Sequence, residues 1–455
     1  MFIARENELA QLKDIAGRKG TASLIYGKRR VGKTRLIKEA VRCCEGSVIY
    51  YECIRDTIKE NIDGFVRTLM NERILTFEAS FDSFQAVFSY LNSLEDHFIV
   101  VIDEFPYLSS LEKQEKIDSI FQSIIDNNLA NVSLIISGSQ ISIMEDMLHE
   151  ENALYGRFDL VIHLRDLNYL EAAEFYPSKT PYEKAAFYSV FGGSPFVLQQ
   201  LHEDDTLEEN IIRVILNESS PVFLYITNML VTDRIGSDNA QRILSVLGNS
   251  KKRYSDIENS LFEKSTGNLA KQLQVLLSTD LIKQDGPINR RNDAKKRSYE
   301  INDNLMRFYY TYVYRNAGSL QMVGPSEFYE RTIAPTLFSD FIPRRFEEIC
   351  RSFFALKARK GELPGITGIG CYYYNDPLRK RNGEFDIALQ FGDVYEILEA
   401  KYHKTPMTLD EIHREAGQIK EIAEINVVSL GFVSVNGFAD REEGYKYYSG
   451  EDLYS

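Results

Sequence analysis

The chain has 455 residues, of which 44% are hydrophobic and 26% are charged, and this composition is typical of folded globular domains. Its 67 acidic and 53 basic residues give a net charge of −14, which excludes a protein whose whole surface binds a polyanion. The sequence has no apolar run of about 18 residues that could span a membrane, and its cysteines form no C-x-x-C pair. We therefore expect a cytoplasmic protein of several domains, without structural zinc or a membrane partner.

Residues 27–34 read GKRRVGKT and fit the phosphate-binding pattern G-x-x-x-x-G-K-[ST]. An apolar run at residues 21–26 predicts a buried strand before this loop, and residues 34–43 predict an amphipathic helix after it. Backbone N–H groups of such a loop form an anion-binding nest at the helix N-terminus. Lys33 would reach the β- and γ-phosphates of ATP, and the Thr34 hydroxyl would bind Mg²⁺. The residues expected to hold the nucleotide are Gly27, Lys28, Arg29, Arg30, Val31, Gly32, Lys33, Thr34 and Arg35.

A second motif, FIVVIDE at residues 98–104, is an apolar run that ends in two acids. Such a run predicts a strand buried on both faces, as in a parallel sheet covered by helices. Asp103 is expected to hold Mg²⁺ through water, and Glu104 to activate the water that attacks the γ-phosphate. A further strand at residues 132–136 runs into Ser137 and Ser139. One of these serines senses the γ-phosphate, unless the segment is a simple Ser-Gly turn.

The segment 234–300 is basic, with 13 Lys and Arg against 8 Asp and Glu. Residues 241–247, 254–261 and 266–279 predict three short helices, and two strands joined by a basic loop follow. This order is typical of a winged helix-turn-helix, whose third helix would read the DNA major groove through Asn268, Lys271 and Gln272. The alternative is that the module only packs against the nucleotide-binding part. The basic residues of the wing loop are Arg290, Arg291, Lys295, Lys296 and Arg297.

A hairpin is predicted near the end of the chain. Residues 384–391 and 394–401 are strand-like and are joined by only two residues, of which Gly392 comes first, as in a type II′ turn. In the register set by this turn, Asp386 lies directly opposite Glu399, with Cβ atoms about 5 Å apart. The two acids repel each other unless a cation lies between them, and a hard divalent cation takes oxygen ligands.

Lys401 projects to the same face as these two acids and would stabilise the charge of a developing phosphorane. The pattern D-x₁₂-E-x-K resembles the core of PD-(D/E)xK nucleases. Such cores add an acid from a preceding helix, and residues 346–354 offer Glu347. The resemblance implies a metal site made of Glu347, Asp386 and Glu399. The alternative is an exposed hairpin face with a cross-strand charge pair.

The chain as a whole resembles the archaeal-type ATPases that also occur in bacteria, a branch of the AAA+ and STAND P-loop NTPases. These proteins carry a C-terminal nuclease-like domain. The motifs that carry the resemblance are FIARENEL (2–9), GKRRVGKT, IVVIDEFPYL (99–108), SGSQISIMEDML (137–148), LYGRF (154–158), GGSP (192–195) and FEEICR…GEFDIAL…EILEAKY.

The resemblance implies further site residues. Arg157 is a candidate γ-phosphate-sensing catalytic arginine that would act on a neighbouring subunit of a homo-oligomer, and Gly193 with Pro195 resembles a short lid motif. For both, the alternative is ordinary loop structure. One departure concerns the helix after the E-x-K strand, where some nucleases carry Gln followed four residues later by Tyr. Here Gln418 is followed by Ile422, which weakens the case for catalysis.

The predicted fold is therefore a multidomain α/β protein. Residues 1–165 form a P-loop parallel-sheet core, 166–233 a helical lid, and 234–315 a winged helix with an exit helix. Residues 316–455 form an α/β restriction-endonuclease-like domain, which a linker within 316–325 precedes.

Two functions follow from this organisation. In the first, ATP binding and hydrolysis with Mg²⁺ control a winged helix that contacts double-stranded DNA and a C-terminal domain that cleaves it. In the second, the chain is a regulatory ATPase switch whose C-terminal domain is an inert binding module.

Overall fold

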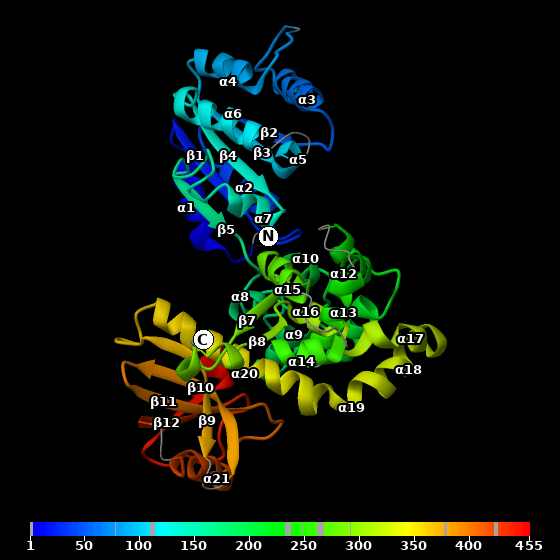
Figure 1. The fold of residues 1–455 in the computed structure, drawn as a ribbon, viewed down its shortest axis with the longest axis vertical. Helices are drawn as coiled ribbons and strands as arrows, with labels where there is room; N and C mark the ends of the chain where they lie inside the picture. Colours follow the sequence, from blue (N-terminus) through cyan, green and yellow to red (C-terminus); the bar gives the residue numbers. More distant parts are fainter. Residues whose placement is uncertain are drawn as a thin grey trace. The chain divides into compact units, whose positions relative to one another are not determined.

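The computed structural model describes residues 3–77, 79–109, 114–232, 238–248, 250–261, 268–291, 293–376, 380–422 and 426–455. The chain divides into two compact units, Met1–Asp166 and Leu167–Ser455, which are drawn from blue to cyan-green and from there to red (Figure 1). Among the helices of the described ranges, none has both the length and the apolar character that a membrane crossing requires.

A five-stranded parallel sheet forms the centre of the first unit, with the strand order β2-β3-β4-β1-β5 (Figure 1). The strands are β1 Thr21–Tyr26, β2 Ser47–Glu52, β3 Phe98–Asp103, β4 Val132–Gly138 and β5 Leu160–His163. The three strands predicted from apolar runs are confirmed as β1, β3 and β4, and β3 and β4 are buried along their whole length. The phosphate loop follows β1, and the two acids of FIVVIDE end β3. Both motifs therefore lie at the carboxyl edge of the sheet, where ligands bind in open α/β folds.

Helices cover both faces of this sheet. Helices α1 (Glu6–Ala16) and α2 (Lys33–Val41) share one apolar core with the sheet. The opposite face packs against α3 Ile58–Asn71, α4 Phe84–Ser93 and α6 Gln114–Asn127. Successive strand residues alternate between the two cores, since side chains along a strand point to opposite faces. The continuous apolar runs of the sequence are thus explained by burial on both sides.

Short helices open the second unit, as expected for residues 166–233. They are α8 Tyr169–Ala173, α9 Pro181–Phe191, α10 Pro195–Leu198, α11 Leu207–Asn210, η1 Ile211–Ile215 and α12 Pro221–Thr232. Three of them start at capping boxes formed by Asn168, Thr180 and Thr206, each paired with a Glu three residues later. The reciprocal bonds satisfy N–H groups that a helix start leaves unpaired.

Three helices and a three-stranded sheet follow. The helices are α13 Asp238–Leu247, α14 Tyr254–Leu261 and α15 Asn268–Ser278, and the strands are β6 Lys252–Arg253, β7 Ile282–Asp285 and β8 Ser298–Ile301. The sheet order is β6-β8-β7, and both pairings are antiparallel. The third helix had been predicted to begin at residue 266, and residues 266 and 267 lie outside the described ranges.

The predicted linker at residues 316–325 is wrong. Helix α17 (Ala317–Val323) occupies most of it, and α18 (Pro325–Phe328) starts directly afterwards. Gly324 has φ 80°, which ends one helix, and Pro325 is the first residue of the next. The Gly and Pro residues that suggested a linker therefore separate two helices.

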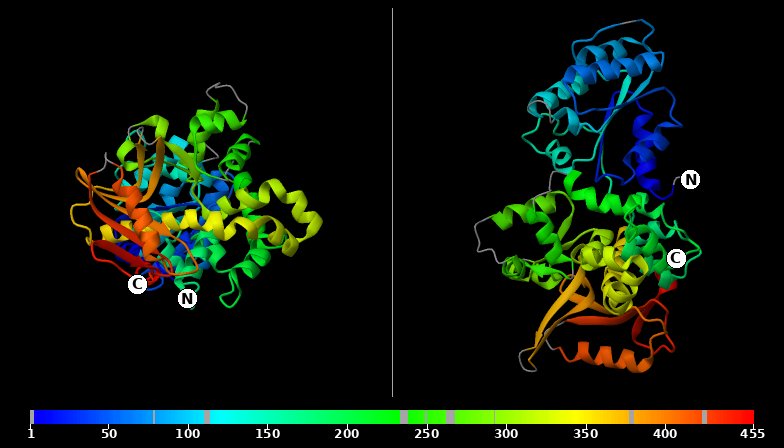
Figure 2. Two further views of the ribbon diagram at one scale, coloured as in Figure 1. Left: turned by 90° about the horizontal axis from the view of Figure 1, so that it is seen from below. Right: turned by 90° about the vertical axis from the view of Figure 1, so that its right-hand side faces the viewer.

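The C-terminal sheet has five strands in the order β13-β12-β11-β10-β9. They are β9 Gly368–Asp376, β10 Arg381–Phe391, β11 Val394–Lys401, β12 Val427–Ser434 and β13 Tyr445–Ser449. Helix α21 (Leu409–Lys420) packs on one face and lies along the sheet (Figure 2, right), while α20 (Ile342–Arg359) contacts β9, β10 and β11.

The register of the β10–β11 hairpin is the one that its turn predicts. Phe391 pairs with Val394, and the pairing continues to Ile387 and Leu398. Gly392 has φ 65°, as the first position of a type II′ turn requires. The paired residues end there, one position before Asp386 and Glu399.

Candidate nucleotide site and nuclease-like site

Two glycines give the phosphate loop its shape. Gly27 has φ 154°, and an added Cβ would lie 2.1 Å from the carbonyl oxygen of Leu164. Gly32 has φ 102° and stands directly before α2, so the loop ends at the positive end of a helix dipole. Lys33 is only 6% exposed, and its Nζ donates to the carbonyls of Gly27 at 2.8 Å and Lys28 at 3.1 Å. The loop therefore presents backbone N–H groups and a buried ammonium to an anion.

Two basic residues of the loop connect it to neighbouring segments. Lys28 forms an ion pair with Asp166. Arg29 donates to the Tyr107 hydroxyl at 2.8 Å, just beyond the FIVVIDE strand. Both contacts hold the loop against the carboxyl edge of the sheet.

The other predicted residues of the loop differ in whether their side chains can reach a nucleotide. Arg30 has φ 65°, a left-handed conformation that is found at functional sites more often than elsewhere. The Val31 side chain is fully buried, so only its backbone can face a ligand. Thr34 and Arg35 are both exposed.

Asp103 is the centre of a hydrogen-bonded cluster. Thr34 Oγ1 donates to Asp103 Oδ2 at 3.2 Å, and the hydroxyls of Tyr50 and Ser137 also bond to this carboxylate. The backbone N–H of Glu104 donates to Asp103 Oδ1 at 3.0 Å. Four donors fix the carboxylate, which is 4% exposed, beside the Thr34 hydroxyl. Such an oxygen pair fits a hard cation such as Mg²⁺.

Glu104 stands at the end of β3 with φ 51°, which is unusual for a residue with a side chain. Its Oε2 accepts from Ser139 Oγ at 2.7 Å and from the Ser139 N–H at 3.3 Å. Ser139 directly follows β4, the strand next to β3. The carboxylate is thus held at the carboxyl edge, near Asp103 and the phosphate loop.

The predicted pair of acids is present in the C-terminal sheet. The carboxyl of Glu399 hydrogen bonds to the carboxylate of Asp386, which also accepts from the Ala400 N–H at 3.1 Å. Burial and the charge of Asp386 raise the pKa of Glu399 well above its usual range, and burial raises the pKa of Asp386. Glu399 is 8% exposed. Both raised pKa values favour one proton held between the two carboxyls, with Glu399 as its donor.

Lys401 lies between two acids. Its Nζ is 3.6 Å from Glu399 Oε2 and 3.3 Å from Glu415 Oε1 on α21. Burial alone would lower the pKa of Lys401, but the negative charge of the Asp386–Glu399 pair and of Glu415 raises it, so the ammonium stays charged. The helix residue that pairs with Lys401 is Glu415, whereas Gln418 had been the candidate on this helix.

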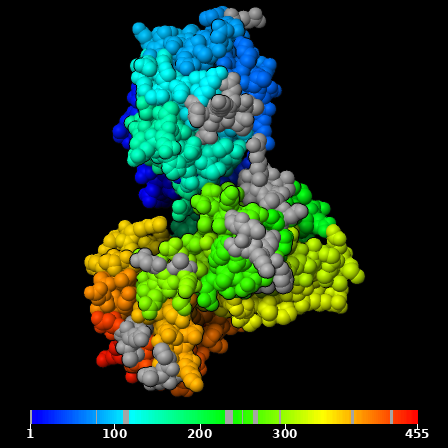
Figure 3. All heavy atoms as spheres, in the orientation of Figure 1, coloured from blue at the N-terminus to red at the C-terminus, as the bar shows by residue number. Residues whose placement is uncertain are grey.

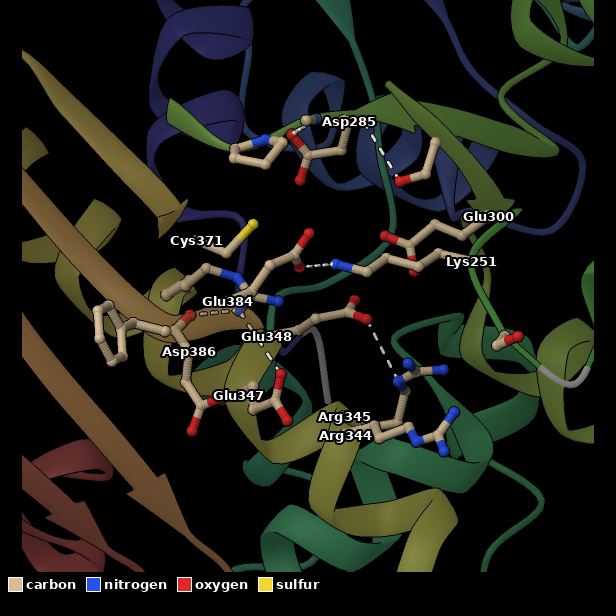
Figure 4. A pocket seen from close by; sticks show the side chains of 16 residues that line it. Lys251, Asp285, Glu300, Arg344, Arg345, Glu347, Glu348, Cys371, Glu384 and Asp386 are labelled. Atoms are coloured by element: carbon tan, nitrogen blue, oxygen red, sulfur yellow. Dashed lines mark hydrogen bonds and ion pairs between the residues drawn. The ribbon is translucent and has the colours of Figure 1, made fainter. Parts of the chain in front are cut away.

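Glu347 on α20 approaches the same acids from the other side. Figure 4 shows its carboxylate close to that of Asp386. Arg351 Nη1 donates to the Asp386 carbonyl at 2.7 Å and lies 3.9 Å from Glu347 Oε2. Burial and the charge of Asp386 raise the pKa of Glu347 to about 7. Even so, within the described ranges no three His, Cys, Asp or Glu side chains are arranged to hold a metal ion.

The loop between β7 and β8, which we call the wing, packs on strand β9. Asn289 donates to the Tyr373 carbonyl at 2.8 Å and accepts from the Tyr373 N–H at 3.1 Å, as a paired strand would. The Ile288 side chain belongs to the apolar core of the C-terminal sheet, and Lys296 Nζ lies 3.6 Å from the centre of the Tyr373 ring. The yellow-green surface of the wing accordingly adjoins the orange surface of β9 and β10 (Figure 3). This contact is with the C-terminal sheet, a partner that neither sequence alternative had named.

Residues 2–201 match a protein family described as an ATPase domain predominantly from Archaea. The N-terminal part of the chain is an archaeal-type ATPase domain. Residues 309–416 match a second family, described as archaeal and bacterial proteins of unknown function. An uncharacterized protein of Methanocaldococcus jannaschii, MJECL04, is 28% identical over 371 residues, which cover 80% of each chain.

A solved structure supports the fold of the ATPase domain. The Walker-type ATPase PABY2304 of Pyrococcus abyssi aligns with 68% of this chain and 96% of its own, with a TM-score of 0.52 and 19% identity. At this identity the likeness concerns the fold alone.

Arg157 does not join the nucleotide site of its own ATPase domain. It precedes β5, and β5 runs parallel to β1, so Arg157 lies at the amino edge of the sheet, opposite the phosphate loop. There its Nε donates to Asp126 Oδ1 at 3.0 Å. Within one chain, Arg157 and the phosphate loop therefore lie at opposite edges of the sheet. A role towards a neighbouring subunit stays a prediction.

The lid motif predicted at Gly193 and Pro195 belongs to the second unit. Gly193 has no room for a side chain, because an added Cβ would lie 1.8 Å from the Leu167 carbonyl oxygen. Pro195 is the first residue of α10. Both observations fit the alternative of loop structure, and a contact with the nucleotide stays a prediction.

Some residues of the two sites were missed by sequence reasoning. Tyr50 lies on β2 and reaches Asp103 only because β2 pairs with β3. Arg351 follows Glu347 by one helical turn, which was a usable signal. Glu415 precedes the buried Ala416 on the sheet-facing side of α21. An acid next to the apolar stripe of a helix was a second signal, because it places a carboxylate near the sheet.

Proposed function

We propose that this chain is an Mg²⁺-dependent ATPase that couples its nucleotide state to a DNA-binding winged helix and to a metal-dependent DNA nuclease site. The observation that carries the first part is the convergence of Lys33, Thr34, Asp103 and Glu104 at one edge of the first sheet. The match of residues 2–201 to an archaeal ATPase domain supports ATP binding and hydrolysis.

Each of these four residues has a distinct role in the proposal. The Lys33 ammonium neutralises the β- and γ-phosphates, and Thr34 and Asp103 supply the oxygens that hold Mg²⁺. Bound Mg²⁺ supplies positive charge to the phosphate oxygens as the transition state forms. Glu104 takes a proton from the attacking water while the water oxygen bonds to the γ-phosphorus and the bond to the β-phosphate breaks.

The nuclease part of the proposal rests on Asp386, Glu399 and Lys401. Loss of the proton shared by the two acids leaves a doubly negative oxygen pair that fits Mg²⁺ or Mn²⁺, with Glu347 beside it. Such a cation, when bound, supplies a more acidic water. The Lys401 ammonium then stabilises charge on the phosphorane, as water oxygen bonds to phosphorus and the sugar oxygen leaves with a proton.

The winged helix supplies the third part, DNA binding. Residues 238–301 contain three helices and an antiparallel sheet in the order that winged helices use. Asn268 and Lys271 on α15 are exposed, and Gln272 is half-buried, so this helix face is available to a major groove. The wing itself is engaged with Tyr373, so the proposed DNA contact is made through α15 and not through the wing.

Two assays test the proposal. Phosphate release from ATP with Mg²⁺ should be lost in Lys33→Ala, and retained hydrolysis would overturn the phosphate-loop assignment. DNA cleavage with Mg²⁺ or Mn²⁺ should be lost in both Glu399→Ala and Lys401→Ala. The absence of wild-type cleavage on linear, circular, single-stranded and duplex DNA would reject the nuclease part and leave the ATPase part standing.

A regulatory ATPase switch with an inert C-terminal module is the second candidate. The observation in its favour is that the acids and Lys401 satisfy one another, with Glu415 as an extra carboxylate. Binding of Mn²⁺ by the second unit distinguishes the two candidates, because the nuclease requires this binding and the inert module does not.

A further inference from the structure

A cavity of about 330 Å³ lies inside the second unit, between the β6-β8-β7 sheet and the C-terminal sheet (Figure 4). One wall comes from the residues around β6, β7 and β8, including Lys251 and Glu300. Another comes from α20, and a third from Cys371 and residues 384–386. Glu347 and Asp386, the acids of the nuclease-like site, line the cavity. The cavity is therefore an approach to that site.

Contacts on several sides hold these walls together. Beyond the Asn289–Tyr373 pair, Lys251 forms an ion pair with Glu384 on β10. Lys283 on β7 lies 3.1 Å from Glu348 Oε2 on α20. Apolar, hydrogen-bonded and ionic contacts thus join the β6-β8-β7 sheet and the wing to the C-terminal sheet and α20. Opening the cavity would break all three kinds of contact at once.

The cavity combines acids with buried arginine. Its lining cations are Lys251, Arg344, Arg345 and Arg351, and its lining acids are Asp285, Glu300, Glu347, Glu348, Glu384 and Asp386. The Arg345 side chain is 12% exposed, and its Nε finds no hydrogen-bond partner although it lies 3.2 Å from Glu348 Oε1. Burial and the neighbouring charge of Arg307 lower the pKa of Arg345 to about 10. A buried guanidinium beside a second cation is stabilised by an anion, and guanidinium groups suit phosphate oxygens.

The size of the cavity limits what can enter. A sphere of 330 Å³ is about 9 Å across, whereas the major groove of B-DNA alone is about 12 Å wide. The volume lies near the lower end of the range of about 300–1,000 Å³ for small-ligand sites. A duplex is excluded, and one nucleotide is the natural size.

We propose that this cavity receives the terminal nucleotide of a single DNA strand, with its phosphate bound by Arg345 in the wall that also holds the acids Glu347 and Asp386. The inference rests on the proposed nuclease function and specifies its substrate as a strand end. A strand without an end would have to pass through the closed junction between the wing and β9.

Fluorescence anisotropy with Ca²⁺ in place of Mg²⁺ tests this inference, because binding is then read without cleavage. The probes are a linear oligothymidine, the same oligothymidine closed into a circle, and a blunt duplex hairpin. Two variants disturb the cavity in different ways: Arg345→Ala removes the guanidinium, and Cys371→Phe fills the space without changing charge. Arg331→Ala is the matched control, since Arg331 is 67% exposed and pairs with Glu327 away from the lining residues.

The linear strand should bind at least about tenfold more tightly than the circle, and each cavity variant should lose about tenfold in affinity for it. Arg331→Ala should bind like wild type, and thermal melting should show that Cys371→Phe is folded. Equal affinity for circle and linear strand overturns the inference, as does unchanged affinity in a folded Cys371→Phe. A separate Mg²⁺ cleavage assay distinguishes the two proposals. Preferential binding of the linear strand without any cleavage rejects only the nuclease. Cleavage of circular DNA as fast as linear DNA rejects only the strand-end site.

Discussion

Replacing Glu399 by glutamine tests whether the two buried carboxyls of the C-terminal sheet share a proton. Glu399 is 8% exposed and donates a hydrogen bond to Asp386. A glutamine amide has nearly the same shape and keeps one donor for that bond. The variant therefore resembles the protonated wild type but cannot ionise, and it cannot give a carboxylate to a metal ion.

The pKa of Glu399 decides whether Glu399→Gln raises or lowers the free energy of unfolding. Burial and the charge of Asp386 raise this pKa well above its usual value of 4.5, so the folded chain keeps a proton that the unfolded chain releases. The associated stability is fully present below pH 4.5 and is lost as the pH rises towards the folded-state pKa. The free energy of unfolding falls by at most about 1.4 kcal/mol for each pH unit through this group. The unfolding free energy of Glu399→Gln should therefore exceed that of wild type by a gap that widens with pH.

Urea unfolding at several pH values between about 5 and 7 measures this gap. Addition of Mn²⁺ should stabilise wild type increasingly at higher pH, because the cation replaces the shared proton, and should leave the variant unchanged. Glu327→Gln, at a carboxylate that is 48% exposed, is the control and should show no widening gap. A gap of the same size at every pH would refute the shared proton.

Three further predictions concern the ATPase domain and the junction of the second unit. Glu104→Gln should bind ATP like wild type but lose about 10²–10⁴-fold in phosphate release, because the attacking water loses its base. Tyr50→Phe should raise the Mg²⁺ concentration for half-maximal hydrolysis by about tenfold, because one hydroxyl that orients Asp103 is lost. Arg307→Met should lower the unfolding free energy of the second unit by about 3–5 kcal/mol, because Arg307 is 2% exposed and neutralises the carboxylate of Glu348 at 2.8 Å.

Each of these predictions has a contrary result. Full turnover in Glu104→Gln would move the proton acceptor elsewhere, and an unchanged Mg²⁺ dependence in Tyr50→Phe would make that hydroxyl purely structural. A loss below about 1 kcal/mol in Arg307→Met, similar to the loss expected for the exposed control Arg331→Met, would show that the buried network is not stabilising.

The sequence by itself determined the parts of this protein that depend on neighbouring residues. Strands β1, β3 and β4 of the first sheet follow from apolar runs, because a strand covered on both faces needs no polar side. The phosphate loop follows from the glycines at positions 27 and 32, whose positive φ angles disfavour any residue with a side chain. A two-residue turn fixes its hairpin register, so the Asp386–Glu399 pair could be predicted across the strands.

The tertiary structure alone decided how distant segments meet. Tyr50 reaches Asp103 across the β2–β3 pair, and Glu415 reaches Lys401 from a helix that packs on the sheet. The wing binds Tyr373 through Asn289, and nothing in either local sequence marks the other as its partner. Local patterns encode the conformation of a segment because they act through adjacent backbone geometry. Contacts between segments depend on the packing of whole elements, and a single sequence carries no local signal for that packing.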